Sequence, residues 1–312
     1  MLILGRCTHE VALTQSPLSP RIIDYEGSSY KTDFWLNQGR EYEDLCERLA
    51  LKALLPPTGD ILMEAGAGFG RLASLYSGYG TVILLDHSLS MLKDARGTWG
   101  ADKRFLFVAA NIYHLPFAEN VLDTVVMIRV MHHLESPALA LAEISRSLRG
   151  NGTFILEYAN KRNLKAILRF GLRRQHWNPF DEQPYEFAPL NFDFHPDWMA
   201  STLQAAGFAI EEERAISSFR LSFLKRRIPA SWLAHTDFVL SRPGGQLKLS
   251  PSVVVRARNT GTPRRTTGAL FRCPACRIDT LRETGGGYLC AHCARRWPEI
   301  DGILDFRWPK GS

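Results

Sequence analysis

The chain has 312 residues, 45% of them hydrophobic, so it can bury a full core and still carry a second, smaller unit. No stretch approaches the roughly 20 apolar residues of a membrane span, and the apolar run at the N-terminus is too short for a secretory signal, so we expect a cytoplasmic protein. The net charge is +6, with basic blocks at 161–174 and 256–265 that suit nucleic acid, anionic lipid, an acidic partner or a solvated face.

Residues 1–57 are expected to form an N-terminal extension with one helix. Residues 41–55 carry apolar side chains at helical spacing, and Pro56-Pro57 ends the pattern. Short apolar runs then alternate with helical patterns, which predicts a doubly wound, mostly parallel sheet in an α/β domain at 58–258. The seven predicted strands are 61–64, 81–86, 104–110, 124–128, 153–158, 208–216 and 252–258, with a helix at 136–148.

A glycine-rich turn follows the first predicted strand. Glu64 precedes glycines at alternate positions, Gly66, Gly68 and Gly70, and a helix-like pattern begins at Arg71. A strand, a tight glycine turn and a helix N-terminus form the element that cradles an adenosyl cofactor. A dinucleotide fingerprint would need a third glycine in place of Arg71. The acidic residue followed by G-x-G-x-G instead resembles motif I of the class I S-adenosylmethionine (SAM) dependent methyltransferases.

Further matches follow this loop in order. Asp86 ends the second strand, where a carboxylate can accept from both ribose hydroxyls. Asn111-Ile112 follows the third strand, where the family usually has Asp beside an apolar residue to hold the adenine, and asparagine can still accept from the adenine amino group. The run from 115 to 152 resembles the ubiquinone-biosynthesis-type ("type 11") methyltransferases, and the resemblance covers roughly 40–260. A structural glycine turn in another α/β fold would leave these ordered matches unexplained. The resemblance implies that SAM is bound by Glu64, Gly66, Gly68, Gly70, Asp86, Asn111 and Ile112.

Catalytic candidates lie after the fourth predicted strand. The methyl group of a sulfonium is already activated, so an enzyme mainly has to align the acceptor, and a general base is needed only if the acceptor must lose a proton. Arg129, His132 and His133 occupy this edge. Adjacent histidines point in different directions, so at most one is expected to face the pocket. A buried, hydrogen-bonded histidine is the alternative for either, and the sequence names no base.

Residues 161–195 interrupt the alternation and are interpreted as an insertion or lid. A predicted helix at 161–174 carries basic residues on one i, i+4 stripe with leucines beside it. The stretch 177–195 is rich in aromatic side chains and proline and is predicted to be irregular. A helix is predicted to resume at 196–206.

Four cysteines follow a segment of linker composition at 259–268. They form two CxxC pairs, which can aim four thiolates at one metal, and in a reducing compartment the spacing favours zinc over disulfides or an iron–sulfur cluster. We therefore expect a separate zinc ribbon at 269–312. The expected metal ligands are Cys273, Cys276, Cys290 and Cys293.

The end of this module resembles a second family. Trp297–Ile303 is similar to the aromatic-Pro-x-x-x-Gly-Ile segment of the small zinc-ribbon activator of tRNA, rRNA and translation-factor methyltransferases. That activator is usually a separate subunit, so the resemblance implies an activator fused in cis. A structural clip and a substrate-recognition finger are the alternatives, and the nearly neutral charge of the module favours the structural role.

The leading hypothesis is a SAM-dependent methyltransferase with a small-molecule or lipid-like acceptor. The aromatic segment suits an apolar pocket, and the basic helix at 161–174 could rest on an anionic membrane. A methyltransferase acting on RNA or on a translation factor is the second hypothesis, and the same basic blocks and the ribbon support it. A non-catalytic SAM-binding or assembly module is the third hypothesis.

Overall fold

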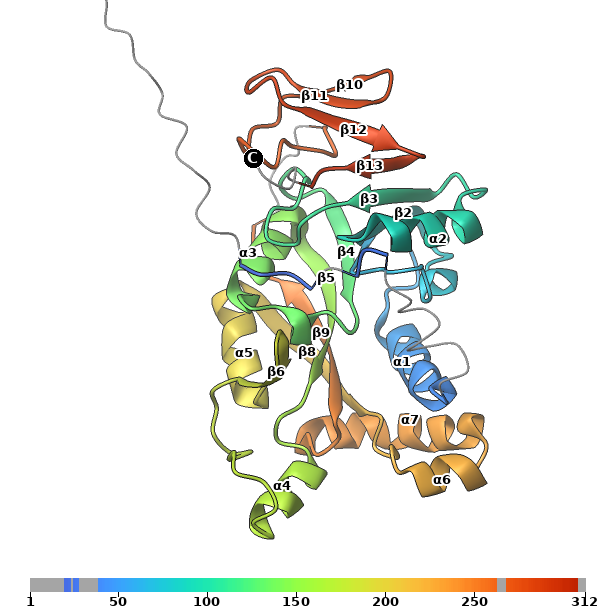
Figure 1. Cartoon of the computed structure of the whole chain (residues 1–312), viewed down its shortest axis with the longest axis vertical. Helices are drawn as coiled ribbons and strands as arrows, with labels where there is room; N and C mark the ends of the chain where they lie inside the picture. Colours follow the sequence, from blue (N-terminus) through green and yellow to red (C-terminus); the bar gives the residue numbers. More distant parts are fainter. Residues whose placement is uncertain (1–19, 24, 28–38, 263–267, 308–312) are drawn as a thin grey trace, which may run out of the picture.

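The computed structural model describes residues 20–23, 25–27, 39–262 and 268–307 (Figure 1). Much of the predicted N-terminal extension and the last residues of the predicted ribbon, 308–312, lie outside this part of the chain. Within it, α1 (Glu41–Leu54) occupies the predicted first helix. None of the helices in the described residues is long and apolar enough to cross a membrane.

The centre of the fold is a twisted, mostly parallel sheet with the strand order β3-β2-β1-β4-β5-β9-β8. The strands from β3 to β5 pair in parallel, while β9 is antiparallel to both of its neighbours. These strands correspond to the seven that the sequence predicts. Their bounds are β1 Gly59–Ala65, β2 Tyr79–Asp86, β3 Phe105–Ala109, β4 Leu122–Met127, β5 Leu148–Ala159, β8 Phe208–Ile216 and β9 Ser252–Asn259.

The prediction of a seven-stranded sheet is wrong because the four-cysteine module adds four strands to its edge. The whole sheet has 11 strands, and β13 pairs in parallel with β3, with Leu304 beside Val108. An edge strand such as β3 presents unpaired backbone groups that another strand can use, which no sequence pattern reports. The added strands are β10 Leu281–Thr284, β11 Gly287–Cys290, β12 Arg296–Ile300 and β13 Ile303–Asp305.

Helices cover both faces of the sheet (Figure 1). The core on one side takes side chains from α3 and α5, and the core on the other side takes them from α1, α2 and α7. Successive residues of one strand alternate between the two cores, as Leu62 and Met63 of β1 do, because strand side chains point to opposite faces. The bounds are α2 Leu89–Trp99, α3 Pro137–Ser147, α4 Leu164–Gly171, α5 Pro196–Ala205, α6 Ser222–Arg227 and α7 Ala230–Leu247.

Several elements differ from the sequence-based predictions. The expected helix after the glycine loop is only a 3₁₀ turn at Ala73–Leu75. The segment predicted to be irregular contains a short hairpin, β6 Tyr185–Ala188 and β7 Asn191–Asp193. The sequence analysis did not predict α6 and α7, and α7 contains Pro243, a residue that usually ends a helical pattern.

The ribbon shares its hydrophobic core with the sheet. Phe306 is buried and lies 5.1 Å from Phe271 and 5.8 Å from Trp297 between ring centres. Phe271 also packs on Phe117 of the large domain, at 5.6 Å. The Phe306 N–H donates to the Ala109 carbonyl at 2.8 Å. The ribbon is therefore supported by the large domain and not by its own small core alone.

Replacing Phe306 by alanine is expected to destabilise the whole protein by about 3–5 kcal/mol, because a buried aromatic side chain is removed from a shared core. Urea unfolding followed by circular dichroism should show one transition at a lower midpoint. Phe187→Ala, at a side chain that is 56% exposed, is the control and should change the free energy of unfolding by less than about 1 kcal/mol. Separate transitions for ribbon and large domain would contradict the shared core.

Candidate functional site

A pocket opens at the carboxyl edge of the parallel strands, where β1, β2 and β4 end. The glycine loop after β1 forms one wall. Gly66 has φ +74°, and a Cβ there would lie 2.1 Å from the Val130 side chain. Gly68 has φ +54°, and its N–H donates to Asp86 Oδ2 at 2.8 Å. Glycine is therefore required at Gly66 both for its backbone conformation and for close packing.

Two acidic side chains point to the recognition of a polar ligand in this pocket. Asp86 accepts from Gly68 and, at 2.9 Å, from the Ser88 N–H, and its burial raises its pKa. Glu64 is buried, and desolvation raises its pKa to about 8 although Arg71 and the Tyr76 hydroxyl act to lower it. Among the residues that the structure describes, the Glu64 Oε2 atom has no hydrogen-bond partner. A buried acceptor without a donor, on the wall of a pocket, fits a ligand that brings its own N–H groups.

The other residues predicted to bind the cofactor divide into two groups. Ile112 lines the pocket together with the glycine loop, Glu64 and Asp86. Gly70 and Asn111 are not among the lining residues. The Gly70 carbonyl accepts from the Trp99 indole at 3.1 Å, and Asn111 Oδ1 accepts from the Tyr113 N–H at 2.8 Å. These two residues shape the loops behind the pocket wall.

A buried ion-pair network supports the floor of the pocket. Glu47 of α1 accepts from Arg71 Nη2 and from Arg129 Nε, both at 2.6 Å, and is 1% exposed. Burial alone would raise the pKa of Glu47, but the two guanidiniums together lower it. Arg71 also pairs with Asp44. From the sequence, Arg71 was predicted only to begin a helix, because no residue spacing indicates that it has a charge partner on α1.

Arg129 is held in an uncommon backbone conformation. Its φ is +61°, and its N–H donates to Glu157 Oε2 at 3.0 Å. Left-handed conformations of non-glycine residues cost energy and tend to occur at functional sites. Arg129 and Arg71 both line the pocket, so its lining holds two cations as well as Glu64 and Asp86.

The two histidines lie against each other, with ring centres 4.0 Å apart. His133 lines the pocket and His132 does not. The Leu190 carbonyl can only accept, so His133 Nδ1–H donates to it at 3.1 Å, and Nε2 is left to accept from the Tyr25 hydroxyl at 3.4 Å. Burial lowers the pKa of both imidazoles, and for His132 the neighbouring His133, Arg129 and Arg220 add to this. Both rings are therefore neutral at neutral pH.

The N-terminal strap, defined as the described residues between 20 and 27, closes one side of the pocket. Ile22, Ile23 and Tyr25 are lining residues. Arg21 binds the Glu135 carboxylate, with its N–H at 2.6 Å and its Nε at 2.8 Å. Glu26 accepts from the Leu89 and Ser90 N–H groups at the start of α2, at 2.7 and 3.2 Å. No sequence motif indicated that this segment would reach the pocket.

The end of the ribbon contacts a loop that lines the same pocket. Asp305 lies beside Ala109, which in turn lies beside Asp86, so the three residues form one row across β13, β3 and β2. Arg307 pairs with Asp305 at 2.9 Å and donates to the His87 carbonyl at 3.1 Å. The loop that carries Asp86 is therefore held partly by residues of the ribbon.

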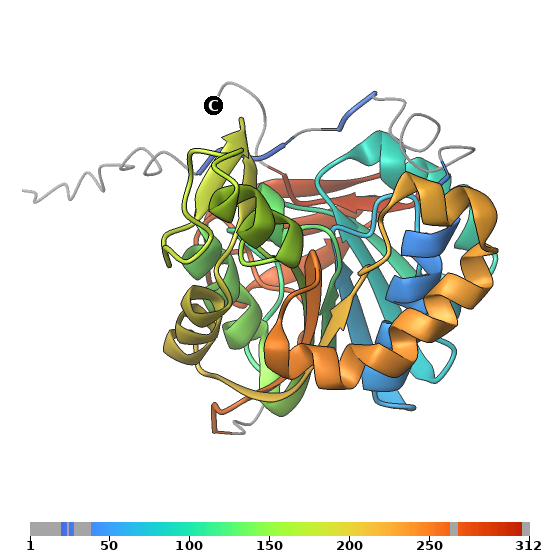
Figure 2. The same ribbon diagram turned by 90° about the horizontal axis from the view of Figure 1, so that it is seen from below.

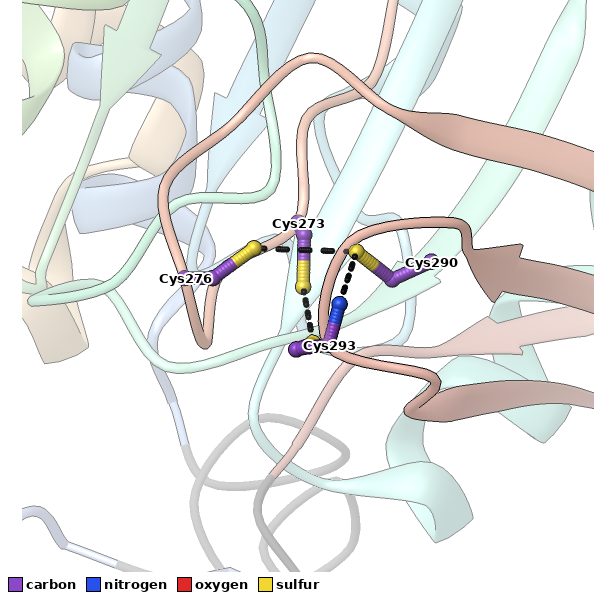
Figure 3. Close-up of side chains that lie close together, drawn as sticks. All are labelled: Cys273, Cys276, Cys290 and Cys293. Carbon is purple, nitrogen blue, oxygen red and sulfur yellow. Dashed lines mark hydrogen bonds between the residues drawn. The ribbon is translucent and has the colours of Figure 1, made fainter. Parts of the chain in front are cut away.

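The four cysteines converge at the other end of the ribbon (Figure 3). Their sulfur atoms all lie within 4.8 Å of one another. The Cys273–Cys293 and Cys276–Cys290 sulfur distances are 3.7 and 3.6 Å. These are far longer than a disulfide bond and close to the ~3.8 Å edge of a tetrahedron of thiolates around zinc. The donor set thus fits a structural zinc ion, while His292 is not part of the cluster.

Replacing Glu47 by glutamine is expected to destabilise the protein by about 3–5 kcal/mol, because two buried guanidiniums lose their shared counter-charge. The free energy of unfolding in urea measures the effect. Glu211→Gln removes the same charge from the surface pairs with Arg256 and Arg258, and should cost less than about 1 kcal/mol. Equal losses in the two variants would show that the buried network has no special role.

The part of the sequence that forms most of this site matches one known protein family. Residues 63–156 match the family described as "Methyltransferase domain". An uncharacterized protein of Methanocaldococcus jannaschii is 36% identical over 108 residues, which are 33% of this chain and 43% of that protein. A demethylmenaquinone methyltransferase of Renibacterium salmoninarum is 31% identical over 112 residues, 35% of this chain and 45% of that enzyme. The matches thus span less than half the length of these relatives.

Solved structures show the same fold. A chain from the complex between a Haloferax volcanii methyltransferase activator and a putative methyltransferase has a TM-score of 0.52 at 17% identity, covering 74% of this chain and 96% of that one. A putative SAM-dependent methyltransferase from Listeria monocytogenes has a TM-score of 0.51 at 17% identity, covering 70% and 99%. Residues 63–156 therefore match the methyltransferase-domain family, and the chain has the Rossmann-like α/β fold of these solved structures.

Proposed function

We propose that this protein transfers a methyl group from SAM to a small or lipid-like acceptor, with the four-cysteine ribbon acting as an activator in the same chain. The observation that carries the proposal is the pocket at the carboxyl edge, which combines the glycine loop, the buried Glu64 with its free Oε2 atom, and Asp86. Acidic, apolar and basic groups all line it, and a cationic donor with a ribose, an adenine and a carboxylate would need each of them.

The chain offers a partner for each part of SAM. Glu64 would accept from the ammonium group of the methionine portion, and Arg71 or Arg129 would face its carboxylate. Asp86 keeps further lone pairs for the ribose hydroxyls after binding Gly68 and Ser88. Ile112 and its apolar neighbours would pack on the adenine. When bound, SAM supplies a methyl group that is already activated by the sulfonium.

His133 is the proposed proton acceptor if the methyl acceptor is a hydroxyl or thiol. Its Nδ1–H is fixed by the Leu190 carbonyl, so the lone pair of its neutral Nε2 faces the Tyr25 hydroxyl on the pocket side. A substrate hydroxyl could replace that of Tyr25 and lose its proton to Nε2. An acceptor with a free lone pair would need no such step, and His133 would then only position it.

Two observations favour a small or lipid-like acceptor. The pocket is lined largely by apolar side chains, including those of the strap. One relative is named as a demethylmenaquinone methyltransferase, which indicates a lipid-like acceptor for that enzyme. A methyltransferase acting on RNA or a translation factor is the second candidate. This candidate is supported by the structural similarity to a chain of the Haloferax volcanii complex, in which the activator and the methyltransferase are named as separate components.

An acceptor search tests the function. Purified protein is incubated with SAM carrying a labelled methyl group and with extract from cells that lack the gene, so that acceptors are unmethylated. Label is expected in the organic-solvent fraction. Label in RNA or in a translation factor would support the second candidate, and binding of SAM without transfer to any fraction would favour a non-catalytic module.

The pKa of Glu64 predicts proton release on donor binding. At about 8 in the empty pocket, most Glu64 is protonated at pH 7, and a cationic donor would favour the carboxylate. SAM affinity should therefore rise with pH from 6 to 7.5, by at most about tenfold per pH unit. Titration calorimetry in buffers of different ionisation enthalpy measures the proton count.

Glu64→Gln is the matched variant for this test, since it keeps the shape of the side chain and cannot ionise. It should bind SAM more weakly and release no proton through this site. An unchanged proton count in Glu64→Gln would assign the release to another group and remove Glu64 from the donor site.

A further inference from the structure

Three helices lie at one end of the molecule. α4, α6 and α7 lie at the lower end in Figure 1 and face the viewer in Figure 2. The start of α4 is joined to the end of α7, since the Leu164 N–H donates to the Leu249 carbonyl at 2.8 Å and Asn160 Nδ2 donates to the Lys248 carbonyl at 2.7 Å. We define the apolar–basic face as the exposed side chains of 164–180 and 221–249.

Apolar side chains gather on this face. Apart from Leu139, Phe187 and Ile278, every large hydrophobic side chain that is exposed in the described part of the chain belongs to it. Trp232 and Val239 are each 74% exposed and lie two turns apart on α7, on the same side of the helix. Such a concentration, in place of scattered single residues, marks an interaction surface.

The charge on the face has one sign. Exposed basic side chains include Arg169 and Arg173 beside α4 and Arg226 and Arg227 on α6. In the ranges 159–180 and 217–249, the only acidic residue is Asp237, which is buried and accepts from the Ser217 and Ser218 N–H groups. The partner must therefore offer both an apolar region and negative charge.

We infer that the apolar–basic face binds the surface of an anionic lipid bilayer. Apolar side chains enter the boundary between headgroups and acyl chains while arginine and lysine meet lipid phosphates. A second copy of the chain paired through a two-fold axis would bring the same basic side chains against each other. RNA would be attracted to the arginines and could stack on Trp232, but it would leave the exposed leucine and valine side chains of the face in water.

The face lies at the same edge of the sheet as the pocket. β4 ends just before Arg129, and β5, its parallel neighbour, leads at this edge into α4. β8 and β5 both run antiparallel to β9, so β8 ends at this edge too and leads into α6. If the proposed function holds, docking would bring the pocket edge near acceptors dissolved in the bilayer. Membrane binding itself does not require methyl transfer.

Vesicle sedimentation of the full chain tests the inference. The protein should sediment with vesicles of phosphatidylcholine and phosphatidylglycerol, less so at high salt, and should stay in solution with phosphatidylcholine alone. The double variant Arg226→Gln, Arg227→Gln should weaken binding by about fivefold per arginine, so roughly 25-fold in all. Arg282→Gln with Arg296→Gln removes the same charge from exposed sites on the ribbon and should leave binding unchanged.

The apolar part is tested by Trp232→Gln with Val239→Gln, which should also lose binding, whereas Leu139→Gln with Ile278→Gln should not. Circular dichroism checks folding, and SAM binding to the same samples separates failure of the donor site from failure of the membrane face. Folded protein that ignores anionic vesicles, or equal losses in face and control variants, overturns the inference. A dimer or an RNA complex that Trp232→Gln with Val239→Gln disrupts, without vesicle binding by the parent protein, overturns it as well.

Discussion

The parallel pairing of β13 with β3 is the interaction on which the arrangement of this protein depends. It joins a module of four short strands to a seven-stranded sheet at the strand next to β2, the strand that carries Asp86. Without it, β3 would be an open edge, and the aromatic side chains around Phe306 would face solvent. The pairing also brings Arg307 to the carbonyl of His87, a residue that lines the pocket, so the ribbon supports the wall of the pocket from behind.

The ionisable groups around the pocket owe their charge states to different physical causes. Glu47 is kept ionised by Arg71 and Arg129, whereas Glu64 on the pocket wall lacks such a pair of cations and its burial raises its pKa. The histidines are kept neutral by burial. A buried carboxylic acid that can ionise when a cation arrives, beside a neutral imidazole, is a reasonable arrangement for a cationic methyl donor and a weakly acidic acceptor. The different pKa values of Glu47 and Glu64 result from burial and charge pairing together, since neither effect alone would distinguish the two carboxyl groups.

The sequence was informative where local patterns determine structure. Apolar runs separated by helical patterns predicted the seven central strands, and the glycine spacing predicted a turn in which Gly66 and Gly68 adopt positive φ. The CxxC spacing predicted a convergence of four sulfurs, which the structure contains. These features depend on residues close together in the chain or on a repeating period.

Such local patterns could not predict contacts between segments that are far apart in the sequence. The pairing of β13 with β3, the reach of Tyr25 to His133 and the shared counter-charge of Glu47 each join residues far apart in sequence. The role of Asn111 also depends on a contact that its position after β3 does not show, because its Oδ1 accepts from the Tyr113 N–H. The helix α7 was missed because Pro243 and two glycines break the pattern that usually identifies a helix.

The most direct test is to measure the affinity of the protein for SAM with and without an intact ribbon. Titration calorimetry would compare the zinc-loaded chain with the double variant Cys276→Ser, Cys293→Ser, with circular dichroism to verify that the large domain stays folded. The account predicts that loss of the metal weakens SAM binding at least about tenfold, and that Arg307→Gln reproduces part of the loss while zinc is retained. Equal affinities in the folded, metal-free variant and the parent protein would contradict it.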